Sequence, residues 1–172
     1  MSLEEYKKVI HEDYLKDINF IDKTIKQLNL KPDSKILDIG TGIGAMAILL
    51  ALNNLTVLTG EPKIDPESDH SHNHNHNHNR GSHNDVCHEG HNLGTTGEDW
   101  GFWADWKVSV KKLNVLDRIK YQLFDVEKLP FNAESFNSIF MYDPLQHVRN
   151  RDLALKECLR ILNPDGVICV IE

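Results

Sequence analysis

The apolar positions of the first 28 residues recur at spacings of three and four, which is typical of an amphipathic helix. The residues that follow this spacing are Tyr6, Ile10, Tyr14, Ile18, Ile21, Ile25 and Leu28. We therefore predict a helix over Leu3–Leu28, ended by the Pro32-Asp33-Ser34 breaker.

The rest of the chain alternates between short apolar runs and helical patterns. Strands are predicted at Lys35–Ile39, Leu55–Thr59, Ile119–Phe124, Ser138–Tyr142 and Val167–Ile171. Helices are predicted at Ala45–Asn53, Trp100–Leu113 and Arg151–Leu162, the last capped by Asn150 and followed by a turn over Asn163-Pro164-Asp165-Gly166. This alternation implies right-handed crossovers and a parallel sheet. The predicted fold class is α/β, a doubly wound, Rossmann-like parallel sheet of about five strands, with its ligand at the carboxyl ends of the strands.

One stretch, Pro62–Asp99, breaks the pattern. Its 38 residues hold no aromatic side chain, seven acidic and two basic residues, and eight of the ten histidines of the chain. Such a composition buries too little apolar surface to offset chain entropy. We predict one domain over residues 1–172 with a mostly disordered insertion at 62–99.

Histidines alternate with other residues at the centre of this insertion, at His70, His72, His74, His76 and His78. In an extended chain all five lie on one side, a spacing that suits Zn²⁺ or Ni²⁺. Two interpretations are open: a metal-binding segment, or a solvated loop that binds metal only adventitiously.

Composition and charge exclude several classes of protein. The net charge of −7 argues against nucleic acid or an anionic membrane as the main partner. Three scattered cysteines make no disulfide framework, and the first residues lack the features of a secretion signal. No apolar run approaches the length of a membrane span. A cytoplasmic protein without membrane spans is expected.

A glycine-rich turn, Gly40-Thr41-Gly42-Ile43-Gly44, follows the first predicted strand and precedes a helix. Glycines at such a turn let the backbone approach a ligand closely. The spacing G-x-G-x-G differs from the G-x-G-x-x-G of dinucleotide sites. Asp38, two residues before the turn, suits a ligand that carries an ammonium group and would repel a pyrophosphate.

Two further acids end the next two predicted strands. Glu61 is placed to accept hydrogen bonds from ribose hydroxyls, and Asp125 from an adenine amino group. A solvated or capping role is the alternative for each. Trp100, Trp103 and Trp106 either line the mouth of the pocket or pack into the core.

Four segments in this order resemble the class I S-adenosylmethionine-dependent methyltransferases. Ile36–Gly44 resembles the cofactor motif of that family, Phe124–Phe131 its adenine-contacting segment, Ser135–Ile139 the entry to its fourth strand, and Leu159–Gly166 the turn before its fifth. The resemblance covers about Leu28–Glu172 apart from the insertion. The sequence is closer to the small-molecule branch that includes ubiquinone and menaquinone methyltransferases, a preference that rests on resemblance. Asp143-Pro144 is similar to the start of a motif of amino-group methyltransferases, but Leu145-Gln146 follows in place of its Pro-aromatic pair.

The resemblance implies S-adenosylmethionine as cofactor and assigns roles to matched positions. Asp38, Gly40, Thr41, Gly42 and Gly44 would hold the methionine moiety, Glu61 the ribose, Asp125 and Val126 the adenine, with Tyr142 and Asp143 completing the site. The loop Asp143–His147 would border the methyl-acceptor site. His147 is the candidate general base, because its pKa lies near working pH; the alternative is that it only packs at a helix start.

Family members usually continue with two more strands, which this chain lacks after Val167–Ile171. The fifth strand is then expected to be an apolar edge, open to a second copy or another subunit. Two functions follow: methyl transfer to a small molecule, or a non-catalytic module of the same fold with a metal-binding insertion.

Overall fold

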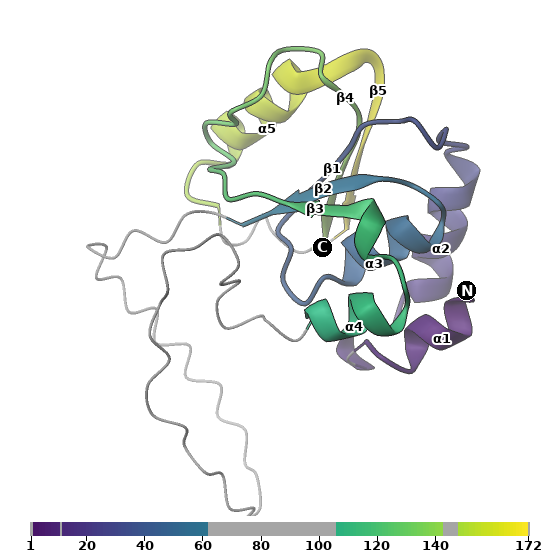
Figure 1. Ribbon diagram of the computed structural model, residues 1–172. Coiled ribbons are helices and arrows are strands. Elements are labelled where there is room, and N and C mark those ends of the chain that lie inside the picture. The colour runs from purple at the N-terminus through teal and green to yellow at the C-terminus, as the bar shows by residue number, and fades with distance from the viewer. Residues whose placement is uncertain (1, 11, 62–105, 143–147, 172) are drawn as a thin grey trace, which may run out of the picture.

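The computed structural model of the protein describes residues 2–10, 12–61, 106–142 and 148–171. Five strands form one parallel sheet in the order β3-β2-β1-β4-β5 (Figure 1). They are β1 (Ile36–Ile39), β2 (Val57–Gly60), β3 (Ile119–Tyr121), β4 (Phe136–Tyr142) and β5 (Leu162–Ile171). The chain moves outward from β1 in one direction to β3 and in the other to β5. The ends of β1 and β4 therefore flank the crevice where such sheets bind ligands.

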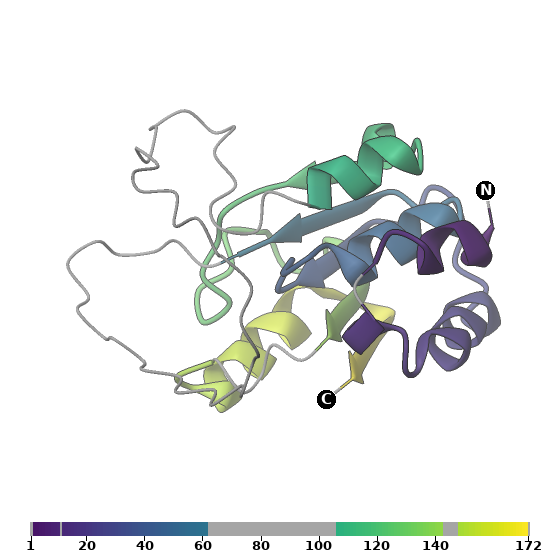
Figure 2. The same cartoon turned by 90° about the horizontal axis from the view of Figure 1, so that it is seen from below.

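The helices cover both faces of the sheet, which confirms the predicted doubly wound α/β class. They are α1 (Leu3–Lys7), α2 (Ile18–Gln27), α3 (Ala45–Leu52), α4 (Trp106–Lys112) and α5 (Arg151–Ile161), with 3₁₀ turns at Glu12–Tyr14 and Leu116–Arg118. In Figures 1 and 2, α5 lies on one side of the sheet and α1 to α4 on the other. Two apolar clusters correspond to these two sides.

Helix α3 forms the centre of the larger cluster, as its apolar sequence predicts. Every side chain from Ala45 to Ala51 is buried. Full burial of a leucine or isoleucine side chain stabilises a fold by about 1.5–3 kcal/mol. Trp106, Val110 and Leu113 of the α4 region join this cluster, so Trp106 packs in the core.

The single long helix predicted over Leu3–Leu28 is wrong, because the structure divides it into α1, a 3₁₀ turn and α2. Contacts with distant parts of the chain explain the break. The Tyr6 hydroxyl donates to the Ala45 carbonyl at 2.9 Å, and the Tyr14 ring lies 5.5 Å from that of Tyr142. Eight residues of straight helix would separate these two tyrosines by about 12 Å along its axis. In the structure, Tyr6 and Tyr14 instead both lie at the edge of the sheet where β1 and β4 end.

Several other predicted boundaries shift. Strand β3 ends at Tyr121 instead of Phe124, although the Gln122 and Phe124 amides still donate to Thr59 and Glu61 carbonyls. Of the helix predicted over Trp100–Leu113, residues 100–105 lie outside the described part of the chain, and the described part of the helix runs Trp106–Lys112. Strands β2 and β4 run Val57–Gly60 and Phe136–Tyr142.

The predicted turn before the fifth strand is a bulge inside it. Strand β5 begins at Leu162, which pairs with Phe136, and the next pair is Ser138 with Val167. The four turn residues of β5, Asn163–Gly166, thus lie opposite one residue of β4, Asn137. Within the described residues β5 pairs only with β4.

Candidate functional site

Three glycines of the turn between β1 and α3 adopt the left-handed conformation that favours glycine. Their φ angles are +87° at Gly40, +47° at Gly42 and +77° at Gly44. For residues with a Cβ, the left-handed conformation costs roughly 1–2 kcal/mol. Among the described residues no atom lies within 4 Å of a Cβ built on Gly42, whereas one on Gly44 would meet Trp106 at 3.0 Å. No described residue therefore blocks the close approach of a ligand to the backbone at Gly42.

The turn is fixed by hydrogen bonds to the end of β2. The amides of Gly40 and Thr41 donate to the Gly60 carbonyl at 3.0 and 3.3 Å. The Gly42 amide donates to a carboxylate oxygen of Glu61. The predicted Glu61 carboxylate is thus held beside the predicted glycine turn. Burial raises the pKa of Tyr121, and the negative charge of Glu61 raises it further. The Tyr121 side chain therefore lies near the Glu61 carboxylate.

Asp38 is fully buried at the end of β1. One carboxylate oxygen accepts a 2.8 Å hydrogen bond from the Thr59 hydroxyl, and the other has no partner among the described residues. Burial raises the pKa of Asp38 to about 8; the hydrogen bond from Thr59 opposes the shift and the charge of Glu61 adds to it. A carboxylate in this state is suited to a cationic hydrogen-bond donor.

A chain of hydroxyls leads to this carboxylate from the glycine turn. The Thr41 and Thr59 hydroxyl oxygens lie 2.8 Å apart. Thr59 has a single hydroxyl proton and donates it to Asp38, so Thr41 donates to Thr59. Both threonines are buried, and the chain orients Asp38 from one side while leaving its second oxygen for another partner.

Asp125 lies beyond β3, in a segment tied to Glu61 through the Phe124 amide, which donates to the Glu61 carbonyl at 3.0 Å. The Asp125 side chain is exposed and one of its oxygens accepts the Glu127 amide at 2.8 Å. The turn-stabilising role weighed for Asp125 is therefore present. The half-buried Val126 packs against the apolar cluster on the α5 side.

Three tyrosines lie near the ends of β1 and β4. Tyr142 ends β4 with its ring against that of Tyr14. Tyr6 is buried and lies close to both Tyr142 and Asp38. Burial raises the pKa of the Tyr6 hydroxyl most, and the charges of Tyr142 and Asp38 raise it further. The N-terminal segment thus packs against the end of β1 where the glycine turn begins.

Some predicted site residues lie outside the described residues. These are Asp143 and His147 of the loop after β4, and the five alternating histidines from His70 to His78. Within the parts of the chain that are described, no group of three or more histidine, cysteine, aspartate or glutamate side chains is placed to hold a metal ion. None of the described helices has the length and apolarity that a membrane span requires.

Sequence reasoning missed Thr59 and the tyrosines of the N-terminal segment. Thr59 pairs with Asp38 across β2 and β1, so a polar residue opposite the acid in a buried strand was the available signal. Tyr6 contacts Ala45, 39 positions away, and no local pattern reports such a contact.

Two family models match this chain, each over a different part of it. A methyltransferase domain model matches residues 103–170. A model described as ribosomal RNA adenine dimethylase matches residues 4–67. The two matches lie on either side of the histidine-rich stretch and together include most of the described residues.

Among curated proteins, the chain resembles ubiquinone/menaquinone biosynthesis C-methyltransferases named UbiE. The protein of Nitrosospira multiformis is 42% identical over 48 residues, 28% of this chain and 20% of that protein. The protein of Geotalea daltonii is 25% identical over 150 residues, 86% of this chain and 49% of that protein. The chain thus spans about half the length of these relatives, or less.

Solved structures share the fold. A putative S-adenosyl-L-methionine-dependent methyltransferase from Methanococcus maripaludis matches with a TM-score of 0.59 and 16% identity, covering 98% of this chain and 60% of that one. A SAM-dependent methyltransferase from Aquifex aeolicus matches with a TM-score of 0.54 and 18% identity, covering 95% and 69%.

Proposed function

We propose that this chain, which resembles the class I S-adenosylmethionine-dependent methyltransferases, binds S-adenosylmethionine at the ends of β1 and β2 and supports methyl transfer to a small-molecule acceptor. The observation that carries the proposal is Asp38. It is a fully buried carboxylate with one oxygen that has no partner among the described residues, beside a glycine turn where no described atom lies within 4 Å of a Cβ built on Gly42.

The residues present fit that cofactor. Asp38 supplies an acceptor for the ammonium group, and the open backbone at Gly42 leaves room for a chain to pass. Glu61, held by the Gly42 amide, is a carboxylate suited to neighbouring ribose hydroxyls. Asp125 and the Val126 main chain are the proposed adenine contacts. When bound, the cofactor supplies a methyl group on a positively charged sulfur.

The residues of this chain then have three tasks. Asp38 binds and orients the amino acid end, and Thr59 and Thr41 hold Asp38 in place. Burial of this region excludes water, which strengthens each electrostatic contact. Tyr142, whose ring packs against that of Tyr14, is proposed to complete the cofactor site beside the end of β4. In-line displacement needs an acceptor atom held close to the methyl group.

The acceptor we propose is a small molecule methylated on carbon. The support is the resemblance to proteins named ubiquinone/menaquinone biosynthesis C-methyltransferases. Such a carbon becomes nucleophilic when a neighbouring hydroxyl loses its proton, and His147 is the proposed base. Asp143 is proposed to complete the cofactor site. The division into one domain with an insertion at 62–99 stays a prediction.

The test is turnover. The purified chain would be incubated with methyl-labelled S-adenosylmethionine and a reduced short-chain quinone, and both S-adenosylhomocysteine and labelled product would be followed. Product formation that is lost in Asp38→Asn and lowered in His147→Ala supports the proposal. A folded chain that binds the cofactor but forms no S-adenosylhomocysteine with reduced quinones or other small acceptors would favour the non-catalytic alternative.

A further inference from the structure

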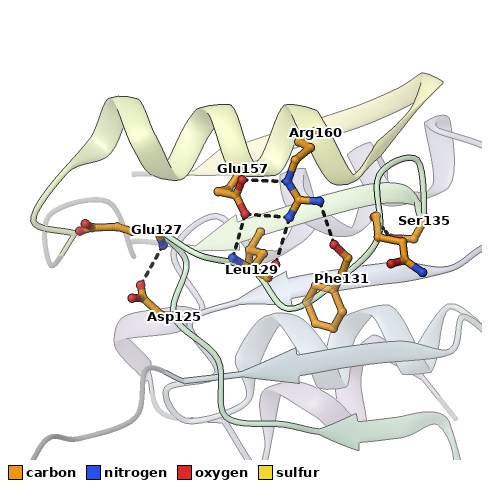
Figure 3. Close-up of polar contacts among 8 residues, drawn as sticks. Asp125, Glu127, Leu129, Phe131, Ser135, Glu157 and Arg160 are labelled. Atoms are coloured by element: carbon orange, nitrogen blue, oxygen red, sulfur yellow. Dashed lines mark hydrogen bonds and ion pairs between the residues drawn. The ribbon is translucent and has the colours of Figure 1, made fainter.

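The segment that follows β3 is fastened to α5 by its main chain. The Leu129 amide donates to Glu157 Oε2 at 3.0 Å, and Arg160 Nη2 donates to the Leu129 carbonyl at 3.0 Å. Arg160 Nη1 donates to the Phe131 carbonyl at 2.8 Å. Figure 3 shows Glu157 and Arg160 projecting from α5 toward this segment. Two side chains of one helix turn therefore hold three main-chain groups.

Glu157 and Arg160 also form a bidentate ion pair with each other. Arg160 Nε donates to Glu157 Oε1 at 2.8 Å, and Nη2 donates to Oε2 at 2.7 Å. Paired bonds of this kind fix the guanidinium and carboxylate planes relative to each other. The hydrogen bond from Arg160 lowers the pKa of Glu157, so the carboxylate is charged at neutral pH. A surface ion pair by itself contributes little stability. The main consequence of this pair is therefore that it fixes the orientation of the two side chains.

A second connection joins the start of the segment to α5. The Glu127 amide donates to Asp125 Oδ1 at 2.8 Å, and Glu127 Oε1 accepts the Asn150 amide at 2.8 Å. Asn150 is the N-cap of α5 and accepts the Leu153 amide. The Asp125 carboxylate is thereby linked through Glu127 to the first turn of the helix.

Apolar packing holds the same segment but does not set its register. Leu129 is buried in the cluster that contains Cys158 and Ile161, and the Phe131 ring lies edge-on against Phe124 and Phe136. Apolar contacts are not directional. The hydrogen bonds to Glu157 and Arg160 are directional, and they act on the main chain of Leu129 and Phe131.

We propose that Glu157 and Arg160 are positioning residues for base recognition, holding the main chain of Leu129 and Phe131 so that Asp125 and Val126 are presented to the adenine. The inference rests on the proposed function, since it assumes that the segment contacts the adenine. It goes further by assigning the selectivity for the 6-amino group to two residues of α5 that have no part in the proposed contacts.

The experiment measures base selectivity. Calorimetry would give dissociation constants for S-adenosylhomocysteine and for its purine analogue without the 6-amino group. The ratio of the two constants reports the contact to the amino group. We expect the ratio in Glu157→Gln and Arg160→Met to fall by about tenfold, toward that of Asp125→Ala, and Arg160→Lys to retain part of it. The matched control is Lys156→Gln, which removes one charge from α5 outside the network and is expected to keep the ratio.

A second measurement reads the network without a ligand. Amide hydrogen exchange of residues 125–131 is expected to accelerate in Glu157→Gln and in Arg160→Lys, which keeps the charge and is the safer variant to fold. If the wild-type chain prefers the 6-amino ligand and the variants keep that preference, the inference is wrong and the proposed function stands. If variants lose affinity for both ligands equally, the pair is only structural and the inference is wrong. If the folded wild-type chain binds neither ligand, the proposed function itself is wrong, and this inference with it.

Discussion

Asp38 is held in its neutral form by the fold and is required in its charged form by the proposed ligand. It is fully buried, and Thr59 supplies its one hydrogen bond among the described residues. Its pKa of about 8, against 3.8 for an ordinary aspartate, expresses the cost of that burial. A buried polar group that lacks a partner is typical of a functional site, where ligand affinity is gained at the expense of stability.

The first prediction is that Asp38→Asn stabilises the ligand-free protein at neutral and alkaline pH. Because the folded-state pKa lies above the unfolded one, the folded state binds more protons between pH 3.8 and about 8. Wild-type stability therefore falls as pH rises through that window and is level above it. The asparagine variant has no such dependence. We expect it to be about 1–3 kcal/mol more stable at pH 8, or roughly 2–4 °C in Tm for each kcal/mol.

Thermal unfolding at pH 5 and pH 8 checks this. The difference in Tm between variant and wild type should be larger at pH 8. A variant that is less stable than wild type at pH 8 would show that Asp38 stabilises the ligand-free fold, which contradicts the prediction.

The second prediction concerns ligand affinity and pH. Binding of an ammonium group requires the Asp38 carboxylate to be charged, and its pKa in the free protein is about 8. Affinity for S-adenosylhomocysteine should therefore rise roughly tenfold per pH unit between pH 6 and pH 8, with up to one proton released per ligand bound. Calorimetry in buffers of different ionisation enthalpy measures both quantities. An affinity that stays constant over this range would contradict the assignment.

At the scale of elements, two glycines that look alike in the sequence have different tasks. Gly42 has φ +47° and no described atom within 4 Å of where a Cβ would be, whereas a Cβ on Gly60 would lie 2.0 Å from the Gln122 carbonyl oxygen. Gly60 permits the close approach of β2 to the segment after β3. Gly42 permits the close approach of a ligand.

The third prediction compares alanine at these two positions. Gly60→Ala should cost about 1–3 kcal/mol or more through overpacking against backbone. Gly42→Ala should cost roughly 1–2 kcal/mol through its left-handed φ, and should also weaken S-adenosylhomocysteine binding about tenfold or more. Thermal unfolding and calorimetry on both variants separate the effects. Wild-type affinity in a folded Gly42→Ala would place the ligand elsewhere.

The sequence predicts elements better than it predicts the contacts between them. The apolar run of α3, the glycine turn and the acids Asp38 and Glu61 follow from local pattern, and the structure places them together. The break in the N-terminal helix does not follow, since Tyr6 and Tyr14 contact residues far along the chain. The sequence predicts a separate turn where β5 has a bulge, because Asn163–Gly166 has the residues of a turn whether or not strand pairing continues on both sides of it.

At the scale of the whole molecule, the order β3-β2-β1-β4-β5 brings Asp38, Glu61 and the start of the Asp125 segment to one edge of the sheet. The parallel arrangement could be predicted from the alternation of strands and helices. The hydroxyl chain through Thr59 could not, because it depends on the pairing of β1 with β2.

The fourth prediction concerns the histidine-rich stretch, whose residues lie outside the described part of the chain. We expect replacement of His70, His72, His74, His76 and His78 by serine to abolish tight Ni²⁺ or Zn²⁺ binding. Affinity for S-adenosylhomocysteine should be the same in both proteins, with or without metal. Titration with each metal chloride and with the ligand measures both. Unchanged metal affinity would rule these histidines out as ligands, and a metal-dependent ligand affinity would indicate coupling.

The most direct test of the account is calorimetric titration of the purified chain with S-adenosylhomocysteine, with Asp38→Asn as the matched variant. The account predicts saturable binding at one site per chain, lost in a variant that is folded and at least as stable as wild type at pH 8. A folded wild-type chain that binds no ligand, or a variant that binds as tightly as wild type, would contradict the assignment of the cofactor site to Asp38 and the glycine turn.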